Sequence, residues 1–312
     1  MGINAQVATV IAYLKANNFV GKEILSLGRQ DKAFSLKDLR NINRNVSAGW
    51  TDSQMEASVK DPSAETFLNL SGFKVSRAID ASDFEGADIV HDLNLAIPEH
   101  LQDITSFFYD GGTLEHVFDV ATSFKNAFDL LKVGGIALFA PPANNQCGHG
   151  FYQFSPELFF RVLSANGFDS IHVYLVTTNR PTKWLKCVDP SRAGRRYQFY
   201  SGEPLQLIAI ARKAKRLQSL VIPQQSDYAE SAWDETAEGR ESRRRSHAGS
   251  VSSAIASRLA FPVSVVARTM FGISLGGRLP GLWRRSMVKF VSPEKDVLFS
   301  IQPSISSTQC FD

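Results

Sequence analysis

Short apolar runs alternate with helical patterns along most of the chain, and this alternation constrains the fold more than any other feature. The first run, residues 23–28, is stopped by Gly28, as expected for a strand buried within a parallel sheet. Six further strands are predicted at residues 74–80, 87–91, 106–110, 136–140, 171–177 and 205–211. Strands that alternate with helices predict a three-layer α/β domain with its ligand site at the carboxyl ends of the strands.

Three segments between these strands carry the signals of amphipathic helices. The first spans residues 7–14, with apolar side chains at helical spacing. The second spans 120–131 and is predicted to end in the basic Lys132 ahead of two glycines. The third begins at Ser155 and Pro156, a cap residue followed by proline at the first helical position, and stops at Gly167.

The connections around the second strand depart from an even alternation. The long stretch after Gly28 has room for extra helices around residues 35–43 and 55–60. By contrast, Asp80 and Asp92 are so close in sequence that no helix fits between the second and third strands, although parallel strands ordinarily need a dozen or more connecting residues. We therefore expect a short, loop-like crossover at residues 82–86.

Composition excludes several classes of protein. The chain has 312 residues, of which 44% are hydrophobic, which argues against collagen-like, coiled-coil and wholly disordered chains. Its formal net charge of +3 is too small to predict a nucleic-acid partner. The 3 cysteines lie far apart, which argues against a disulfide framework or a structural zinc site. No signal peptide or membrane span is indicated, so we expect a cytoplasmic protein.

The character of the chain changes after the last predicted strand. Residues 1–213 are predicted to form the α/β domain, and 214–253, rich in Ser, Glu, Gln and Arg, a disordered linker. Residues 254–312 form a basic, amphipathic tail in which Trp283, Arg284 and Arg285 stand beside apolar residues. Such a tail fits either a solvated face or peripheral contact with a membrane surface.

Acidic residues and glycines gather where the predicted strands end. Asp80 ends the second strand, Asp92 follows the third, and Asp110 ends the fourth, with Gly111 and Gly112 directly after it. An acidic side chain at the end of a second strand can accept hydrogen bonds from both hydroxyls of a ribose. The alternative is that such an aspartate only caps a turn.

Together these segments resemble the class I S-adenosylmethionine-dependent methyltransferases, and within them the branch acting on small molecules and lipids. The resemblance covers about residues 20–213 and implies a Rossmann-like, doubly wound, mostly parallel sheet of seven strands. It is carried by residues 24–28, 78–80, 91–92, 114–117, 130–135 and 154–156.

The resemblance also implies roles for particular residues. Gly28 would let the cofactor's methionine moiety approach the backbone, Asp80 would hold the ribose, and Asp92 would meet the adenine amino group. The stretch from Asp110 through Gly111 and Gly112 to His116 would line the crevice near the sulfonium.

The first loop departs from the family pattern because it holds a single glycine, followed by Arg29. One hypothesis is that Arg29 replaces the missing backbone donors by pairing with the cofactor carboxylate. The other is that it points to solvent, as surface arginines usually do.

Methyl transfer to a hydroxyl needs a base, and an imidazole suits that task near neutral pH. His116, after the fourth strand, and His149, in a glycine-punctuated loop after the fifth, are the candidates. Each could instead be a hydrogen-bond partner behind the site, and Glu115 is either a site carboxylate or a charge favoured at a helix start. No metal site is predicted, since no histidine pair at i, i+4 spacing and no cysteine cluster is present.

The leading function is therefore methyl transfer from S-adenosylmethionine to a small or lipid-linked acceptor. The alternative is a catalytically silent module of the same fold that binds or regulates a partner. A nicotinamide-dependent dehydrogenase ranks low because the Gly-x-Gly-x-x-Gly pattern stops after its first glycine, Gly28.

Overall fold

The computed structural model describes residues 2–179, 182–193, 201–231 and 288–291. The described residues fall into two units. Of the described residues, the first unit comprises 2–179, 182–187, 203–223 and 290–291, and it contains the seven predicted strands. The second contains helices α7 (Pro190–Ala193) and α8 (Ser226–Ser231). Strand β12 (Val288–Val291) is also described.

All seven predicted strands are present, and they lie in one sheet. In spatial order they are β5 (Ile89–Val90), β4 (Val75–Asp80), β2 (Glu23–Leu27), β6 (Thr105–Asp110), β7 (Leu131–Phe139), β11 (Leu205–Lys213) and β9 (Phe168–Thr177). Only β11 among these seven runs antiparallel to its neighbours. The mostly parallel, Rossmann-like sheet expected from the sequence is confirmed.

Besides β12, four short strands among the described residues were not predicted. β10 (Trp184–Cys187) pairs with β9, and β8 (Pro142–Asn144) pairs with β11, both antiparallel. β1 (Ile3–Asn4) and β3 (Lys32–Ala33) form a separate parallel pair. At two to four residues each, they are too short to show a hydrophobic period in the sequence.

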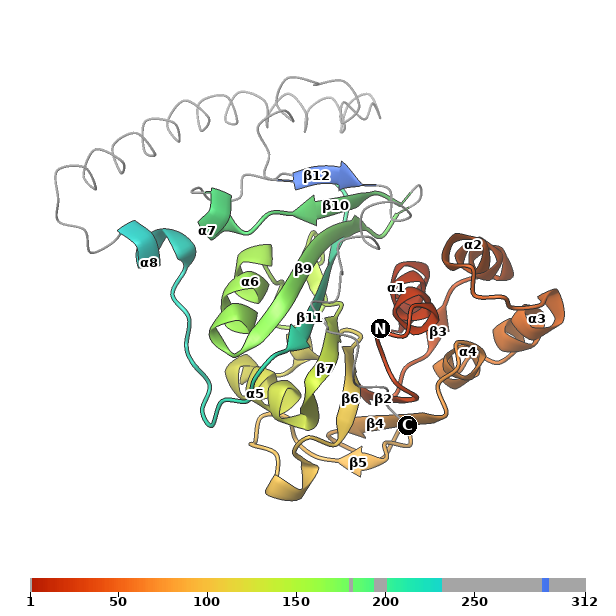
Figure 1. Cartoon of the computed structure of the whole chain (residues 1–312), viewed down its shortest axis with the longest axis horizontal. Coiled ribbons are helices and arrows are strands. Elements are labelled where there is room, and N and C mark those ends of the chain that lie inside the picture. Colours follow the sequence, from red (N-terminus) through yellow and green to blue (C-terminus); the bar gives the residue numbers. More distant parts are fainter. Residues whose placement is uncertain (1, 180–181, 194–200, 232–287, 292–312) are drawn as a thin grey trace. The chain divides into compact units, whose positions relative to one another are not determined.

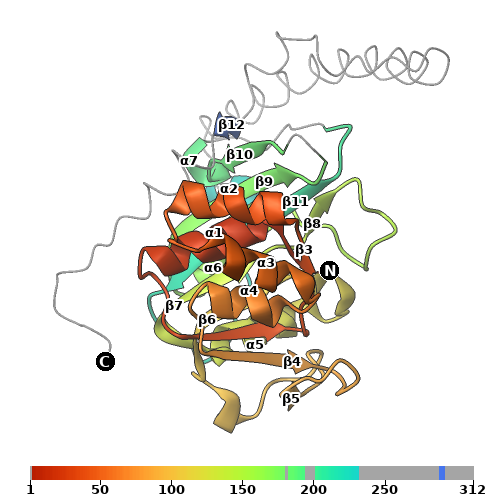
Figure 2. The ribbon, with the colours of Figure 1, turned by 90° about the vertical axis from the view of Figure 1, so that its right-hand side faces the viewer.

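Helices cover both faces of the sheet, which makes three layers (Figures 1 and 2). One face carries α1 (Ala5–Ala16), α2 (Leu36–Val46), α3 (Asp52–Lys60) and α4 (Ala64–Leu70), and the other carries α5 (Val120–Leu130) and α6 (Pro156–Ala165). Helices α2 and α3 are the extra helices predicted after the first strand, and each begins with a capping box. No helix separates β4 from β5, as the short crossover predicted.

Aromatic side chains fill the space between the sheet and α5 and α6. The ring of Phe139 on β7 lies 5.9 Å from Phe124 on α5 and 5.4 Å from Phe159 on α6, centroid to centroid. All three side chains are buried. Burial of each contributes on the order of 1.5 to 3 kcal/mol, which holds these helices against the sheet.

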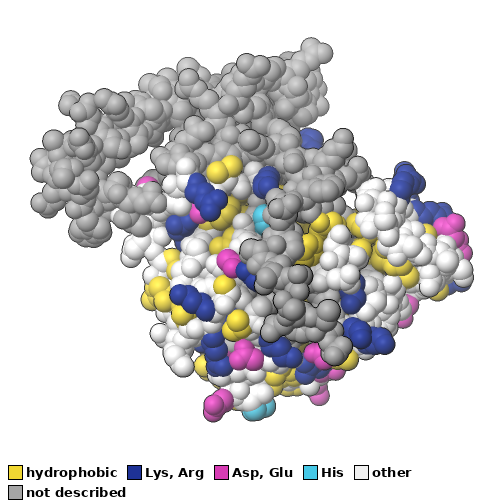
Figure 3. Space-filling model, viewed as in Figure 1, with side chains coloured by type: hydrophobic (Ala, Val, Ile, Leu, Met, Phe, Trp, Pro, Cys, Tyr) yellow, Lys and Arg dark blue, Asp and Glu magenta, His cyan; other side chains and the backbone are white. Residues whose placement is uncertain are grey.

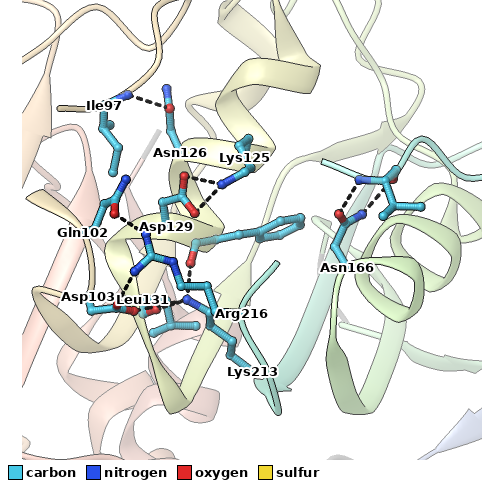
Figure 4. Close-up of polar contacts among 12 residues, drawn as sticks. Ile97, Gln102, Asp103, Lys125, Asn126, Asp129, Leu131, Asn166, Lys213 and Arg216 are labelled. Carbon is cyan, nitrogen blue, oxygen red and sulfur yellow. Dashed lines mark hydrogen bonds and ion pairs between the residues drawn. The ribbon is translucent and has the colours of Figure 1, made fainter. Parts of the chain in front are cut away.

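Helix α5 ends earlier than the sequence predicts. Leu131 already has extended backbone angles and begins β7, so Lys132 and the two glycines lie in the strand. The basic side chain that serves the end of the helix comes instead from β11. The buried Lys213 ammonium donates hydrogen bonds to the Phe128 carbonyl at 2.8 Å and to the Leu131 carbonyl, and lies 3.3 Å from Asp103 (Figure 4).

Contacts with the domain continue beyond its predicted boundary at residue 213. Arg216 pairs with Asp103 at 2.9 Å, and the Asn166 side chain exchanges two hydrogen bonds with the Val221 backbone, at 2.8 and 2.9 Å (Figure 4). Residues 214–223 are therefore part of the first unit, which corrects the predicted start of the linker. Residues 232–253 of that linker and all of the tail except β12 lie outside the described residues.

Charges of both signs are interspersed over the described part of the face seen in Figure 3. Within the described ranges, no helix combines the length and the apolar character needed to cross a lipid bilayer.

Candidate functional site

The strand order reverses between β2 and β6, because the chain runs from β2 outward through β4 and β5 and then returns to β6 on the other side. In open α/β sheets the ligand crevice lies at such a point, beyond the carboxyl ends of the strands. Gly28 stands there directly after β2, in a left-handed conformation with φ +69°. A Cβ at Gly28 would lie 3.5 Å from Asp80 Oδ2 and 3.4 Å from Thr113 Oγ1. The ends of β2, β4 and β6 therefore converge on Gly28.

Asp80 keeps one carboxylate oxygen available at this crevice. Its Oδ1 accepts a hydrogen bond of 2.6 Å from the Ala81 amide, whereas Oδ2, on the side of Gly28, has no donor among the described residues. Asp92 follows the neighbouring strand β5, where the His91 amide donates to the Asp80 carbonyl at 2.7 Å. Asp80 and Asp92 thus lie at one edge of the sheet, as predicted from the strand ends.

The Asp92 carboxylate is exposed and closes a local turn. Its Oδ1 accepts hydrogen bonds from the Asn94 backbone amide at 2.9 Å and the Asn94 side chain at 2.8 Å, and these lower the pKa of Asp92. Asp92 therefore caps its own turn with one oxygen. Its second oxygen has no donor within the described part of the chain.

Arg29 neither points to solvent nor remains free to pair with a ligand, contrary to both sequence hypotheses. Its guanidinium lies 2.6 Å from the Glu65 carboxylate and 2.9 Å from that of Asp88, and it donates to the Gly86 carbonyl. Arg29 thus ties the end of β2 to helix α4 and to the crossover between β4 and β5.

Gln30 is the residue of the crevice that the sequence did not single out. It is buried, and its side-chain nitrogen donates to the Leu27 carbonyl at 2.8 Å. A Cβ on Gly111 would lie 2.2 Å from Gln30 Oε1 and 2.7 Å from the Tyr109 hydroxyl. Gly111 therefore makes room for Gln30, and this side chain occupies the space between Gly28 after β2 and Gly111 after β6. The only sequence signal is its position, two residues after the single glycine of the first loop.

Asp110, at the end of β6, is fully buried and organises the turn that follows. Its Oδ1 accepts hydrogen bonds from the Gly112 amide at 3.2 Å and the Thr113 amide at 2.8 Å, while Oδ2 has no partner in the part of the chain described. Burial raises the pKa of Asp110 to about 6 despite these bonds. The Asp110 carboxyl group therefore mainly contacts the backbone of its own turn. Gly112 lies in that turn with φ +107°, a backbone conformation that favours glycine.

The next turn, η2 (Leu114–His116), begins a second cluster. The Glu115 side chain is fully buried, and neither of its oxygens has a hydrogen-bond donor among the described residues. Burial, followed by the charge of Asp110, raises the pKa of Glu115 to about 8. His149 Nε2 lies 3.4 Å from Glu115 Oε1, beyond ordinary hydrogen-bond distance, and has no hydrogen-bond partner of its own.

His116 completes this cluster. Its ring lies 4.8 Å from the ring of His149, centroid to centroid, at an interplanar angle of 76°. Partial burial, followed by the charge of His149, lowers the pKa of His116. The structure therefore brings together the three residues that the sequence proposed for catalysis: Glu115, His116 and His149.

The loop after β7 is tied to Glu115 by its backbone. The Phe151 amide donates to the Glu115 carbonyl at 2.7 Å, and the Tyr152 amide at 3.3 Å. A Cβ on Gly150, which has φ +75°, would lie only 2.6 Å from that carbonyl oxygen. The close approach that places His149 over Glu115 therefore depends on Gly150.

Two exposed aromatic rings flank this cluster. Phe118 is 73% exposed and Phe151 is 67% exposed, and their rings meet edge to face at 5.9 Å. The Tyr152 hydroxyl donates to the Phe118 carbonyl at 2.7 Å, which fixes the pair in place. Such a rim offers apolar surface to a ligand beside the buried acid.

The nucleoside half of S-adenosylmethionine fits these residues, because Asp80 has an unused oxygen beside a glycine at the crevice. The methionine half would meet the Gln30 side chain there, and not the glycine-rich backbone that the family pattern implies. The sheet order and these strand ends define a Rossmann-like α/β domain.

Comparisons with known proteins give structural matches only: no protein-family model and no curated protein matches the chain. Among the solved structures, this chain is similar to the methyltransferase CalH in complex with SAH, with 15% sequence identity and a TM-score of 0.37. The match covers 67% of this chain and 55% of the CalH chain. The chain thus spans about half the length of that protein.

Two further matches have the same character. One is 1,6-didemethyltoxoflavin-N1-methyltransferase of Burkholderia thailandensis, with bound 1,6-didemethyltoxoflavin and S-adenosylhomocysteine (17% identity, TM-score 0.37, 68% of this chain and 78% of that chain). The other is a SAM-dependent methyltransferase from Archaeoglobus fulgidus (12% identity, TM-score 0.35, 65% and 93%).

Proposed function

We propose that this chain transfers a methyl group from S-adenosylmethionine to a small-molecule or lipid-linked acceptor. The observation that carries the proposal is the free Asp80 oxygen facing Gly28 at the point where the strand order reverses. A ribose diol can be held there by charge-assisted hydrogen bonds. When bound, S-adenosylmethionine supplies the methyl group on a sulfonium.

The other residues at the strand ends take complementary roles in this proposal. Asp92 accepts a hydrogen bond from the adenine amino group with its free oxygen. The turn formed by Asp110, Gly111 and Gly112 lines the crevice between the nucleoside and the acceptor. Arg29, held by Glu65 and Asp88, acts as a positioning residue for the end of β2.

The cluster at Glu115 faces the acceptor in this proposal. His149 or His116 accepts the proton of an acceptor hydroxyl, and the buried Glu115 side chain, 3.4 Å from His149 Nε2, positions the His149 ring. Holding the acceptor atom about 3 to 3.5 Å from the methyl carbon supplies much of the rate.

The exposed pair of Phe118 and Phe151 supports an acceptor with an apolar or aromatic body. The methyltransferase of Burkholderia thailandensis has 1,6-didemethyltoxoflavin bound as its small molecule beside S-adenosylhomocysteine. We place the reaction in the cytoplasm, and peripheral membrane contact through residues 254–312 remains a prediction.

The Gln30 side chain favours a second candidate function, the catalytically silent module, because it occupies space beside Gly28 that the methionine half would use. The two functions differ in cofactor binding. Calorimetric titration with S-adenosylmethionine and S-adenosylhomocysteine is expected to show saturable binding that Asp80→Ala abolishes. Asp83→Ala, which removes an exposed carboxylate in the next turn, serves as the matched control. If neither compound gives heat of binding, the silent module is correct.

A further inference from the structure

The cluster at η2 contains two imidazoles and a carboxylate. Both oxygens of Glu115 and the Nε2 atom of His149 have no hydrogen-bond partner among the described residues, so they are available to coordinate a metal ion. One ligand atom each from Glu115, His116 and His149 lie within 4.8 Å of one another. Two of these residues are adjacent in sequence, and the third lies on the loop after β7, so their spacing in sequence gave no metal signature. His91 and Asp92 do not join them: the His91 Nε2 contacts the Leu95 carbonyl at 2.9 Å, and Asp92 closes its own turn.

The buried carboxylate requires a partner that the described residues do not provide. Glu115 is fully buried and lacks a donor on either oxygen, and an uncompensated charge in such surroundings costs several kcal/mol. A proton or a cation would neutralise it.

The distance between Glu115 and His149 fits two ligands of one metal ion better than a hydrogen bond. Ligand atoms at about 2.0 to 2.1 Å from a tetrahedral Zn²⁺ lie roughly 3.3 Å apart. His149 Nε2 and Glu115 Oε1 lie 3.4 Å apart, whereas a charged N–H···O bond has a length of about 2.7 to 2.9 Å. The His116 side chain is exposed, so it can rotate to close the remaining distance.

The loop that carries His149 is prepared for this role before any ligand binds. Its backbone is fixed on Glu115 by the Phe151 and Tyr152 amides, and the His149 amide donates to the Gln146 carbonyl at 2.9 Å. Preorganisation of this kind lowers the cost of assembling a site from separate segments.

We propose that Glu115, His116 and His149 bind a divalent transition-metal ion of the Zn²⁺ type, with at least one coordination position left open. Three protein ligands with an open position are the pattern of catalytic rather than structural zinc sites. The ion would be coordinated by an oxygen donor of the acceptor; this role rests on the proposed function, whereas metal binding itself does not. A bound hydroxyl would lose its proton to solvent water more readily, so the ion would then replace a histidine as the group that activates the acceptor.

The test uses the full chain, freed of metal with a chelator and titrated with Zn²⁺ by calorimetry and with Co²⁺ by visible absorption. We expect saturable binding of about one equivalent, with the absorption of a Co²⁺ site that has nitrogen ligands. His149→Asn and His116→Asn are each expected to weaken binding by at least roughly tenfold. His100→Asn, which changes an exposed histidine elsewhere, is the matched control and should leave binding unchanged.

Several results would overturn the proposal. They are the absence of saturable binding, binding that both histidine variants leave intact, and an equal loss in His100→Asn, which would mark an adventitious ion. Thermal unfolding of each variant without metal shows whether it is folded, and Glu115→Gln, which keeps the side-chain volume, provides a third variant of the same site.

Cofactor titrations keep this result separate from the proposed function. Asp80→Ala should abolish binding of S-adenosylhomocysteine and leave Zn²⁺ binding unchanged, and His149→Asn should do the reverse. Zn²⁺ binding without cofactor binding would retain the metal site and remove methyl transfer, whereas cofactor binding without Zn²⁺ binding would remove only the metal site.

Discussion

His149 Nε2 lies 3.4 Å from Oε1 of Glu115, a fully buried carboxylate that has no hydrogen-bond donor in the described part of the chain. The two residues come from different connections, η2 and the loop after β7, and meet because backbone amides of that loop bind the Glu115 carbonyl. Their geometry therefore depends on a short stretch of backbone that can be altered without touching either side chain.

Gly150→Ala should displace His149 from Glu115. The added Cβ would approach the Glu115 carbonyl oxygen to 2.6 Å, and φ +75° is unfavourable for alanine, so we expect a loss of about 1 to 3 kcal/mol in the free energy of unfolding. Urea denaturation measures that loss, and Zn²⁺ affinity should fall with it. Gly148→Ala is the control, because a Cβ there meets nothing within 4 Å. Equal effects of the two substitutions would contradict this explanation.

Arg29→Ala should lower stability without weakening the binding of S-adenosylhomocysteine. The Arg29 side chain is 24% exposed, and its guanidinium forms ion pairs with Glu65 and Asp88. Its removal should therefore lower the free energy of unfolding by about 1 kcal/mol. Calorimetry should give an affinity within a few-fold of the unmodified chain. If the free energy of S-adenosylhomocysteine binding falls by much more than the free energy of unfolding, Arg29 pairs directly with the cofactor carboxylate.

Lys213→Met should destabilise the domain by about 2 to 4 kcal/mol, because it leaves the Phe128 and Leu131 carbonyls at the end of α5 without their donor. Burial lowers the pKa of Lys213, and the nearby Asp103 opposes that shift. Chemical denaturation measures the effect, with Lys132→Met, an exposed lysine of the adjoining strand, as the control. Similar values for both variants would show that Lys213 does not cap the helix.

Stability should fall as the pH is lowered from about 6.5 toward 4, in part through His172 on β9. Burial, followed by the charge of Lys186, lowers the pKa of His172 to about 4, so the folded state keeps it neutral while the unfolded chain takes up a proton below about 6.5. The unfolded state then binds more protons, and up to about 3 kcal/mol is lost across this window. Urea midpoints measured at several pH values should show a shallower decline in His172→Gln; an identical decline would assign the effect to other groups.

The sequence by itself determined the succession of strands and helices. The apolar runs ended at Gly28, Asp80 and Asp110 or within a residue of those positions, because burial in a parallel sheet requires continuous apolar side chains. The short crossover before Asp92 followed from chain length alone. The end of α5 could not be predicted from the local sequence. The side chain that caps it, Lys213, lies 85 residues beyond the Phe128 carbonyl that it binds.

The tertiary structure alone decided what the side chains at the strand ends contact. Arg29 is bound by partners 36 and 59 residues away, Gln30 lies between the ends of β2 and β6, and His149 meets Glu115 across two loops. Local spacing determines which edge of the sheet a residue reaches, since side-chain direction follows the backbone period. Its partner there depends on how separate connections close over that edge and on which charges burial leaves uncompensated, and these are properties of the packed chain.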